Sequence, residues 1–380
     1  MQRHVSIQVS GRVDLPLDGP PVLACGADLK SVFCVTRGRQ AILSPPIGDL
    51  SEYASCQFYR EAVDELLRRL QIQPAIVAHD LHPDYESTRF AKTFPAGRKI
   101  AVQHHHAHVA ACMAEHGLAG PVIGVALDGS GYGPDGTVWG GEFLVADYAG
   151  YRRVGHFKPY RLPGGEGAIR HPPRMALSWL AEECGERADA LGAQWLPAIP
   201  PDHRKTLLGL IASGAHSPWT SSAGRLFDAV SALLGLCDKI SHEGQAAMRL
   251  QAAADRRESE ALPVELEDRA GVVVLSFGPA LRALLEQREA GVGIPILAAR
   301  FHRAVAAAVA AVCGRLRDRE GLARVVLSGG VFQNDLLLDW LTDALSAGGF
   351  EVYSHHQVSP TDAGLALGQA AVALAAATEH

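Results

Sequence analysis

The segment PVIGVALDGSGYGPDGTVWGGEFLVADY, residues 121–148, carries the pattern that sets the expected fold. It begins with an apolar run typical of a buried strand, passes through a turn rich in glycine and aspartate, and continues into a hairpin expected around Asp135. The segment PVLACGADLKSVFCVTRGRQAILS, residues 21–44, has the same layout, with its hairpin turn expected at Gly38. This recurrence predicts an internal duplication.

Between and after these segments, apolar strands alternate with helical patterns. Helices are expected in YASCQFYREAVDELLRRL, SAGRLFDAVSALLGL, LAARFHRAVAAAVAAVCGRL and DAGLALGQAAVALAAA, and buried strands in PAIVAHD and RVVLSGG. This alternation predicts an α/β fold. The least regular stretch, residues 185–220, is interpreted as an insertion or a lid loop, and residues 255–275 as a second loose segment.

Composition limits the class of protein. The chain has 380 residues and a net charge of -6, without a long block of lysine or arginine, which argues against nucleic-acid binding. Its seven cysteines are scattered and form no C-x-x-C pair, so neither a disulfide framework nor a zinc finger is expected. We see no signal core and no membrane-spanning stretch, and therefore expect a soluble, cytoplasmic protein.

Four histidines fall within five positions in VQHHHAHVAACMAEHG, residues 102–117. On a helix, His104 and His108 are one turn apart on the same face, where two imidazoles can share a metal ion. His105 and His106 then point elsewhere. The alternative is that these histidines are polar helix residues bonded to neighbouring loops, or anion binders.

Two imidazoles do not complete a metal site, so carboxylates are sought nearby. Asp128 follows an apolar strand, where α/β sheets place their ligands, and Gly129 beside it would allow a phosphate or metal to approach the backbone. Asp362 lies near the start of the last helix. The alternatives are a turn residue for Asp128 and a helix cap for Asp362.

A third group of residues is consistent with nucleoside binding. In VVLSGGVFQND, Gly329 and Gly330 would let a flat ligand or a phosphate lie against the backbone, and Asn334 opens a helix. Asp228 and Glu243 are carboxylates among small and apolar residues, suited to ribose hydroxyls or, alternatively, to pairing with nearby arginines.

Taken together, the motifs resemble the C-terminal carbamoyltransferase region of the HypF family, which acts in nickel-iron hydrogenase maturation. The resemblance extends from about residue 20 to 375 and rests on VQHHHAHVAA, ALDGSGYGPDGTVWGGE, GGEGAIRHPPRMAL, AGRLFDAVSALLGL, HEGQAAM, VVLSGGVFQN and SPTDAGLALGQA. It implies a duplicated fold of the actin, sugar-kinase and Hsp70 type, with two lobes and an interlobe cleft. We accordingly expect an N-terminal extension over residues 1–20, a first lobe over 21–120 and a second lobe with insertions over 121–380.

The resemblance also implies an activity. Proteins of this family use carbamoyl phosphate and ATP to form carbamoyl adenylate, then transfer the carbamoyl group to the C-terminal cysteine of HypE, a precursor of the cyanide ligands on iron. The matching positions imply a divalent metal, iron, zinc or manganese, held by His104, His108, Asp128 and Asp362. They imply a nucleotide pocket lined by Asp128, Gly129, Asp228, Glu243, Gly329, Gly330 and Asn334.

A full HypF carries, before this region, an acylphosphatase-like domain, a cysteine-rich zinc-binding segment and a YrdC-like domain that makes the adenylate, and none is present in this sequence. The chain is therefore expected to be either a short form that receives carbamoyl adenylate, for instance from a separate full-length HypF, or an excised domain. Two other functions stay open: hydrolysis of carbamoyl phosphate or ATP, and non-catalytic docking to HypE or HypF. Outside the motifs, His82 and His302 are expected to pack or to form hydrogen bonds.

Overall fold

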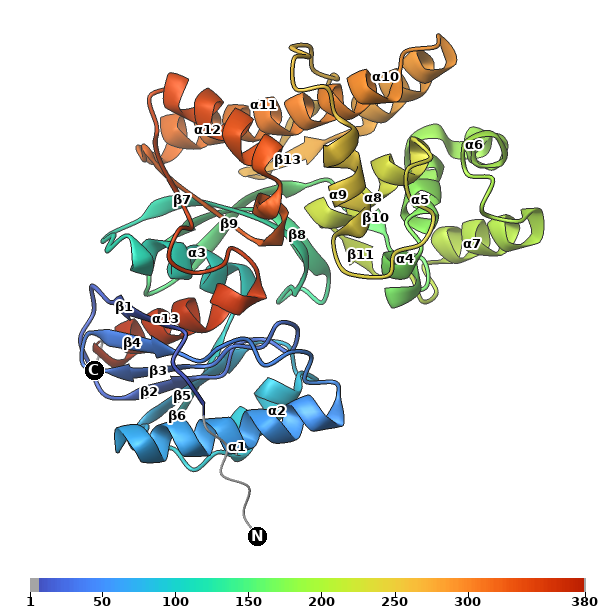
Figure 1. The fold of residues 1–380 in the computed structure, drawn as a ribbon. Coiled ribbons are helices and arrows are strands. Elements are labelled where there is room, and N and C mark those ends of the chain that lie inside the picture. The colour runs from blue at the N-terminus through green and yellow to red at the C-terminus, as the bar shows by residue number, and fades with distance from the viewer. Residues whose placement is uncertain (1–6, 379–380) are drawn as a thin grey trace.

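The computed structural model describes residues 7–378, whose strands form two sheets (Figure 1). The first sheet has the strand order β1-β4-β3-β2-β5-β6. Strands β2, β3 and β4 are antiparallel neighbours, whereas β5 lies parallel to β2 and β6 parallel to β5. The strands are β1 (Gly11–Asp14), β2 (Val22–Ala24), β3 (Cys34–Arg37), β4 (Gln40–Leu43), β5 (Ile76–Asp80) and β6 (Arg98–Val102).

The second sheet repeats this order. Strands β9-β8-β7 are antiparallel neighbours, and β14 then lies parallel to β7 and β15 parallel to β14. The repeated order and the hairpin turns at Gly38 and Asp135 confirm the duplicated α/β fold of the actin, sugar-kinase and Hsp70 type. The strands are β7 (Val122–Tyr132), β8 (Val138–Ala146), β9 (Tyr151–Phe157), β14 (Arg324–Ser328) and β15 (Glu351–Ser354).

Two helices, α3 (His104–Glu115) and α13 (Leu365–Thr378), lie between the two sheets (Figure 1). Every described position of α3 and most of α13 is buried, and both helices share one apolar cluster with strands of each sheet. They touch backbone to backbone, because a Cβ on Gly368 would stand 1.8 Å from the carbonyl oxygen of Ala107. The division predicted at residue 120 assigns α13 to the second lobe, whereas this helix also packs on β2, β3 and β5 of the first sheet.

The outer face of the first sheet is covered by α1 (Tyr53–Leu70) and α2 (Glu86–Thr93), whose buried residues form a separate apolar cluster. The predicted N-terminal extension contributes a strand, since β1 pairs with β4. Residues 1–6 of that extension lie outside the described part of the chain. We call the first sheet with α1 and α2 the first lobe, and the second sheet with its helices the second lobe.

The stretch expected to be irregular, residues 185–220, is largely helical, so the predicted loop is wrong. It contains α6 (Ala188–Trp195) and α7 (Pro201–Ser213), and Pro201 occupies the first turn of α7, where proline is favoured. The stretch ends with β11 (Trp219–Thr220), and the elements before and after it in the chain are β10 (Tyr160–Arg161), α4 (Glu166–Arg170), α5 (Pro173–Cys184), α8 (Ala223–Leu233) and α9 (Gln245–Ala253). Likewise, residues 255–275 contain β12 (Glu265–Arg269), paired with β13 (Val272–Ser276).

The far side of the second sheet carries α10 (Gly278–Glu289), α11 (Ile294–Glu320) and α12 (Asp335–Ala347). By length and composition α11 would be able to cross a membrane, a possibility that the sequence pattern did not predict. Of its most apolar window, 67% is buried inside the fold, as in the core helix of a globular domain. All seven cysteines are free thiols, as expected from their spacing.

Candidate metal centre

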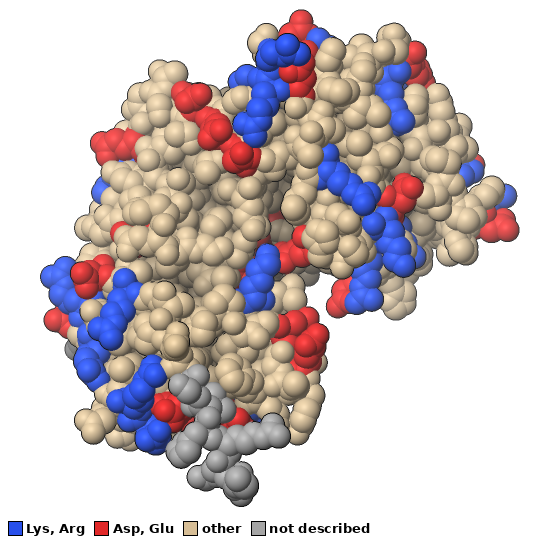
Figure 2. All heavy atoms as spheres, in the orientation of Figure 1, with Lys and Arg blue, Asp and Glu red and all other residues tan. Residues whose placement is uncertain are grey.

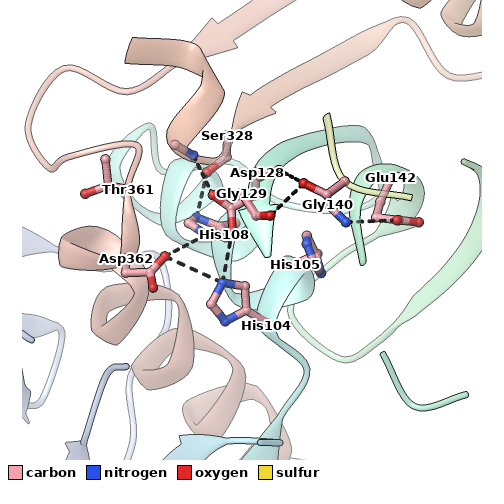
Figure 3. A network of polar contacts seen from close by, with 12 residues as sticks. His104, His105, His108, Asp128, Gly129, Gly140, Glu142, Ser328, Thr361 and Asp362 are labelled. Atoms are coloured by element: carbon pink, nitrogen blue, oxygen red, sulfur yellow. Dashed lines mark hydrogen bonds and ion pairs between the residues drawn. The ribbon is translucent and has the colours of Figure 1, made fainter. Parts of the chain in front are cut away.

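Four side chains predicted as metal ligands come together at the start of α3 (Figure 3). Their ligand atoms all lie within 4.8 Å of one another. The Nε2 atom of His104 lies 3.5 Å from Asp128 Oδ2 and 3.6 Å from Asp362 Oδ1. The Nε2 atom of His108 lies 4.0 Å and 3.6 Å from the same two oxygens. The i, i+4 spacing therefore places both imidazoles on one side of the helix, as predicted.

Local backbone features aim the two carboxylates at the histidines. Asp128 lies where the pairing of β7 with β8 shifts register, between Leu127 and Gly131, and such irregularities re-aim a side chain out of the regular pleat. Asp362 begins a single 3-10 turn, η3 (Asp362–Gly364), capped by the hydroxyl of Thr361, just before α13. Thr361, and not Asp362, supplies the cap of this turn, whereas the side chains of both aspartates lie beside the two histidines.

The donor set fits a divalent metal ion. Both Nε2 atoms are buried and find no hydrogen-bond partner among the described residues, which is costly unless a ligand occupies them. Two neutral imidazoles and two carboxylates balance the charge of a divalent cation and suit iron, zinc or manganese. Ligand atoms on one such ion stand about 3 to 3.5 Å apart, so the separations at His104 require only a small contraction.

A carboxylate that the sequence analysis missed contacts Nδ1 of His104, the nitrogen that faces away from the other candidate ligands. Asp80, the last residue of β5, is fully buried and its Oδ2 atom lies 2.8 Å from Nδ1 of His104. Its other oxygen accepts a hydrogen bond of 2.8 Å from the backbone N–H of His82. Because a carboxylate only accepts, Nδ1 of His104 carries the hydrogen and Nε2 presents its lone pair to the metal position.

A series of three polar side chains lies behind Nδ1 of His108, and the sequence analysis missed these residues as well. The Nδ1 atom of His108 lies 3.4 Å from Oγ of Ser328, which lies 2.8 Å from Nε2 of His355. The Nδ1 atom of His355 lies 3.0 Å from Oε1 of Glu115, an ion-pair contact outside hydrogen-bond geometry whose negative charge favours a hydrogen on that nitrogen. Glu115 in turn accepts from the backbone N–H groups of residues 356, 357 and 358. This series, which we call the Glu115 relay, orders the hydrogens so that Nε2 of His108 also presents a lone pair.

Electrostatics in the cluster favour a cation. Burial opposes charge on His104, yet the carboxylates of Asp80 and Asp362 raise its pKa well above the ordinary value. Burial likewise opposes ionisation of Asp128 and Asp362, but the neighbouring histidines hold both pKa values below normal. By contrast, burial and the nearby His104 hold the pKa of His105 well below its ordinary value. The position between the four ligand atoms is therefore one where positive charge is stabilised.

The WGGE segment stabilises the backbone that carries Asp128. Glu142 is fully buried, accepts the N–H of Gly140 at 3.1 Å and forms an ion pair of 2.6 Å with Arg153. The hydroxyl of Ser222 donates to the carbonyl oxygens of Asp128 and Gly129, 3.0 Å and 2.6 Å away. These contacts fix the backbone of β7 around Asp128, and Figure 3 shows Gly140 and Glu142 on the same side of the cluster as His105.

Two of the predicted nucleotide residues adjoin the metal cluster. The backbone N–H of Gly330 donates to Oδ1 of Asp128 at 2.9 Å, so one aspartate connects the metal position to the turn after β14. Gly329 has a φ of 108°, and a Cβ there would stand 2.2 Å from the carbonyl oxygen of Leu127. Glycine is therefore required by the packing of this turn on β7, a reason different from the ligand approach that we had expected.

The structure places three further nucleotide candidates, Asn334, Asp228 and Glu243, in internal contacts. Asn334 caps α12 through Oδ1 and reaches Nε2 of His302 through Nδ2, at 2.9 Å, which agrees with the packing role expected for that histidine. Asp228 is buried in an ion pair of 2.8 Å with Arg225, as in the alternative that we had kept open.

Glu243, just before α9, forms an ion pair of 2.9 Å with Lys30, in the loop after β2, and so joins the second lobe to the first. Figure 2 shows the surface hollowed between the lobes at this face, with charged side chains along the edges. No described contact draws Asn334, Asp228 or Glu243 to the metal cluster, and their part in nucleotide binding stays a prediction.

Comparison with known proteins agrees with these features. Residues 124–369 match the family described as "Carbamoyltransferase, Kae1-like Domain, second subdomain", and residues 18–115 match "HypF Kae1-like domain". A crystal structure titled full-length HypF in the phosphate- and nucleotide-bound form superposes with a TM-score of 0.91 at 37% identity, covering 96% of this chain and 57% of that one. HypF of T. kodakarensis gives 0.85 at 30% identity, with 96% and 48% covered.

Curated relatives differ in length. Carbamoyltransferase HypF2 of Cupriavidus necator is 39% identical over 95% of this chain and 47% of its own length, and HypF of Rhizobium leguminosarum bv. viciae is 39% identical over 95% and 46%. This chain thus spans about half the length of those two relatives. A shorter protein of C. necator, named a carbamoyltransferase HypF homolog, is 40% identical over 94% of this chain and 92% of its own length. The chain belongs to the HypF carbamoyltransferase family, of which it contains the Kae1-like domain.

Proposed function

We propose that this chain is a metal- and nucleotide-dependent carbamoyltransferase that moves the carbamoyl group of carbamoyl adenylate to the C-terminal cysteine of a HypE-type protein. One observation carries the proposal. His104 and His108 each present an unpartnered, buried Nε2 atom to Asp128 and Asp362, and the hydrogens on their other nitrogens are fixed by Asp80 and the Glu115 relay. Membership of the HypF family supplies the substrate class.

The chemistry requires no nucleophile from this chain. The partner's thiolate attacks the carbamoyl carbon, the C–S bond forms, and the C–O bond to the adenylate phosphate breaks, so that AMP leaves with the electron pair. A bound divalent metal supplies Lewis-acid stabilisation of the oxygen charge that develops in this step. The residues of the chain hold the four ligand atoms in register and bury them from water.

The adenylate has to be formed from carbamoyl phosphate and ATP before transfer. We assign that step to a YrdC-like domain, whether in another protein such as a separate full-length HypF or elsewhere in the same polypeptide. With this division of labour the chain works in the cytoplasm beside HypE, without nucleic acid or membrane.

The test is transfer by the purified chain reconstituted with iron(II), zinc or manganese(II). Carbamoyl adenylate is supplied, and mass spectrometry follows the carbamoyl group on HypE. We expect transfer that depends on metal and is lost in His108→Ala. It should be retained in His106→Ala, a matched variant on the same helix whose imidazole contacts the carbonyl oxygen of Asp147.

Three outcomes would contradict the proposal. Undiminished transfer by a folded His108→Ala variant removes the metal role. When carbamoyl phosphate or ATP is the substrate, phosphate release without HypE, together with no modified HypE, identifies a hydrolase instead. Binding of HypE without turnover under every metal identifies a docking module. Separate assays for AMP with pyrophosphate and for ADP with phosphate then show whether the chain also activates carbamoyl phosphate.

A further inference from the structure

A third unpartnered imidazole nitrogen lies next to the metal cluster. The Nε2 atom of His105 is buried and has no hydrogen-bond partner among the described residues, like the Nε2 atoms of His104 and His108. The other two are explained by a metal ion, but His105 lies outside the group of four whose ligand atoms converge. A different ligand chemistry is needed to explain it, because a buried polar group without a partner loses its hydrogen bonds to water and gains none in return.

The helix cap fixes which nitrogen of His105 carries the hydrogen. Gln103 caps α3, and its Oε1 atom accepts the backbone N–H of His106 at 2.9 Å, which sets the orientation of the amide. Its Nε2 group is therefore the donor, and it lies 3.1 Å from Nδ1 of His105 and 3.2 Å from the carbonyl oxygen of Tyr132. An imidazole nitrogen that accepts a hydrogen bond carries no hydrogen. Neutral His105 thus has its hydrogen on Nε2, the opposite tautomer from His104 and His108.

The ring of His105 packs on the irregular part of β7 that follows Asp128. The ring of His105 is fully buried, and its centroid is 5.3 Å from that of His104. Its Cε1 edge packs so closely on Gly131 that a Cβ there would stand 2.5 Å away. Figure 3 shows His105 beside His104, on the side of the cluster towards Asp128 and Gly140.

We propose that the Nε2–H group of His105 donates a hydrogen bond to a carbonyl or phosphoryl oxygen of the group held at the metal. The proposal rests on the proposed function, and deepens it by adding a catalytic residue that binds the oxygen rather than the metal. A lone-pair tautomer would compete for the metal, whereas an N–H group stabilises oxygen charge as the thiolate attacks. His105 supplies this donor without a change in its protonation state.

His302 provides an internal control for the tautomer argument. Its Nε2 atom accepts from Nδ2 of Asn334, whose Oδ1 caps α12, and its Nδ1 atom donates to the carbonyl oxygen of Ala298 at 2.7 Å. Both nitrogens are thus satisfied within the fold. The same reasoning that places hydrogen on Nε2 of His105 places it on Nδ1 of His302.

The first experiment reads the tautomers directly. Long-range proton–nitrogen NMR spectra of the zinc-loaded chain with nitrogen-15-labelled histidine are expected to show the Nε2–H tautomer for His105 and the Nδ1–H tautomer for His302. Inorganic phosphate and carbamoyl phosphate are then added to saturation, as followed by phosphorus NMR.

A shift of the His105 Nε2–H signal with both probes supports a phosphoryl oxygen as acceptor, and a shift with carbamoyl phosphate alone supports the carbonyl oxygen. No shift with either probe, or an Nδ1–H tautomer at His105, overturns the proposal. These readouts do not depend on transfer, so a failed transfer assay with a shifted His105 signal refutes only the proposed function.

The second experiment uses variants. His105→Phe removes the donor and is expected to lower the transfer rate constant about 100-fold or more, with zinc content unchanged. His105→Gln keeps an N–H group and should recover part of that loss. His106→Gln is the matched control and should leave transfer within a factor of about three. Equal rates for His105→Phe and the unmodified chain would contradict the proposal, and the spectra test it even if the variant does not fold.

Discussion

Two helices of this molecule begin with an amide side chain that caps the helix and also donates to a buried histidine. At α12, Asn334 donates to His302, and the other nitrogen of that imidazole is bonded as well. At α3, Gln103 donates to His105, and the other nitrogen is left without a partner among the described residues. The same kind of capping amide therefore satisfies His302 fully but leaves Nε2 of His105 free to bind a ligand. The two histidines differ in this one unpaired nitrogen.

The largest difference in metal content should appear when His108, on α3, and His302, which contacts the cap of α12, are each replaced by alanine. His108→Ala is expected to lower bound zinc at least tenfold, because one of the four candidate ligands is lost. His302→Ala should retain its zinc but lose about 2 kcal/mol of unfolding free energy, because it leaves a cavity and an unpaired Asn334 amide. Metal analysis and denaturant unfolding of both variants measure this. Loss of zinc from His302→Ala would remove the distinction between the two regions.

The pH dependence of stability should sharpen the same comparison. Burial lowers the pKa of His302 from 6.5 to about 4, so the unfolded chain takes up a proton before the folded one as the pH falls. Stability from this residue is present above the unfolded value and is lost between pH 6.5 and 4, about 3 kcal/mol in total.

Urea unfolding of the unmodified chain and of His302→Leu across this pH range isolates the effect, because other acid-sensitive groups contribute equally to both. The unfolding free energy of the unmodified chain should fall by about 3 kcal/mol relative to that of His302→Leu as the pH is lowered from 6.5 to 4. A constant difference between them would show that His302 is not held neutral.

The Glu115 relay extends the comparison to His108. Ser328→Ala and Glu115→Gln each break the ordered hydrogens behind that imidazole and should weaken zinc affinity about 10- to 100-fold. His106→Gln is the control on the same helix, because His106 contacts the carbonyl oxygen of Asp147 and no member of the relay. Competition titrations with a chelator give the affinities, and unchanged values for both relay variants would show that His108 needs no such support.

The smallest effect is expected at the ion pair between the lobes. Lys30 and Glu243 retain 39% and 54% of their side-chain exposure, so Lys30→Ala should change the unfolding free energy by less than about 1 kcal/mol. Glu243→Gln should behave alike if the pair is only structural. A loss of ATP affinity in Glu243→Gln but not in Lys30→Ala would instead place Glu243 in the nucleotide pocket. Isothermal titration with ATP distinguishes the two cases.

The four candidate ligands were predictable because simple rules place them. A spacing of four fixes the relation of His104 to His108, and Asp128 ends the apolar run of β7, although that strand continues to Tyr132. Asp80 carries the same signal as Asp128, a carboxylate at the end of a buried strand, and was not recognised. Ser328, His355 and Glu115 come from three separate elements and meet only after folding, so no local pattern identifies them.

The fold shows a similar division. Two copies of one strand-and-hairpin pattern predicted the duplication, because pairing of neighbouring strands is local in sequence. The stretch before α7 was interpreted as a loop because of its prolines. Proline is common in turns but also in the first turn of a helix, where Pro201 lies. The position of α13 between the sheets depends on contacts with residues far away in the chain, and its apolar sequence does not say which sheet it meets.

Gly368 is far in sequence from His104 and His108, but it affects the position of both residues relative to Asp362. Its hydrogen, in place of a side chain, allows α13 to lie directly on α3 at Ala107. The helix α3 carries His104 and His108, and the turn before α13 carries Asp362. The absence of a side chain on Gly368 therefore determines how far Asp362 lies from the two histidines. The spacing of the four candidate ligands therefore depends partly on a helix contact that none of the four side chains makes.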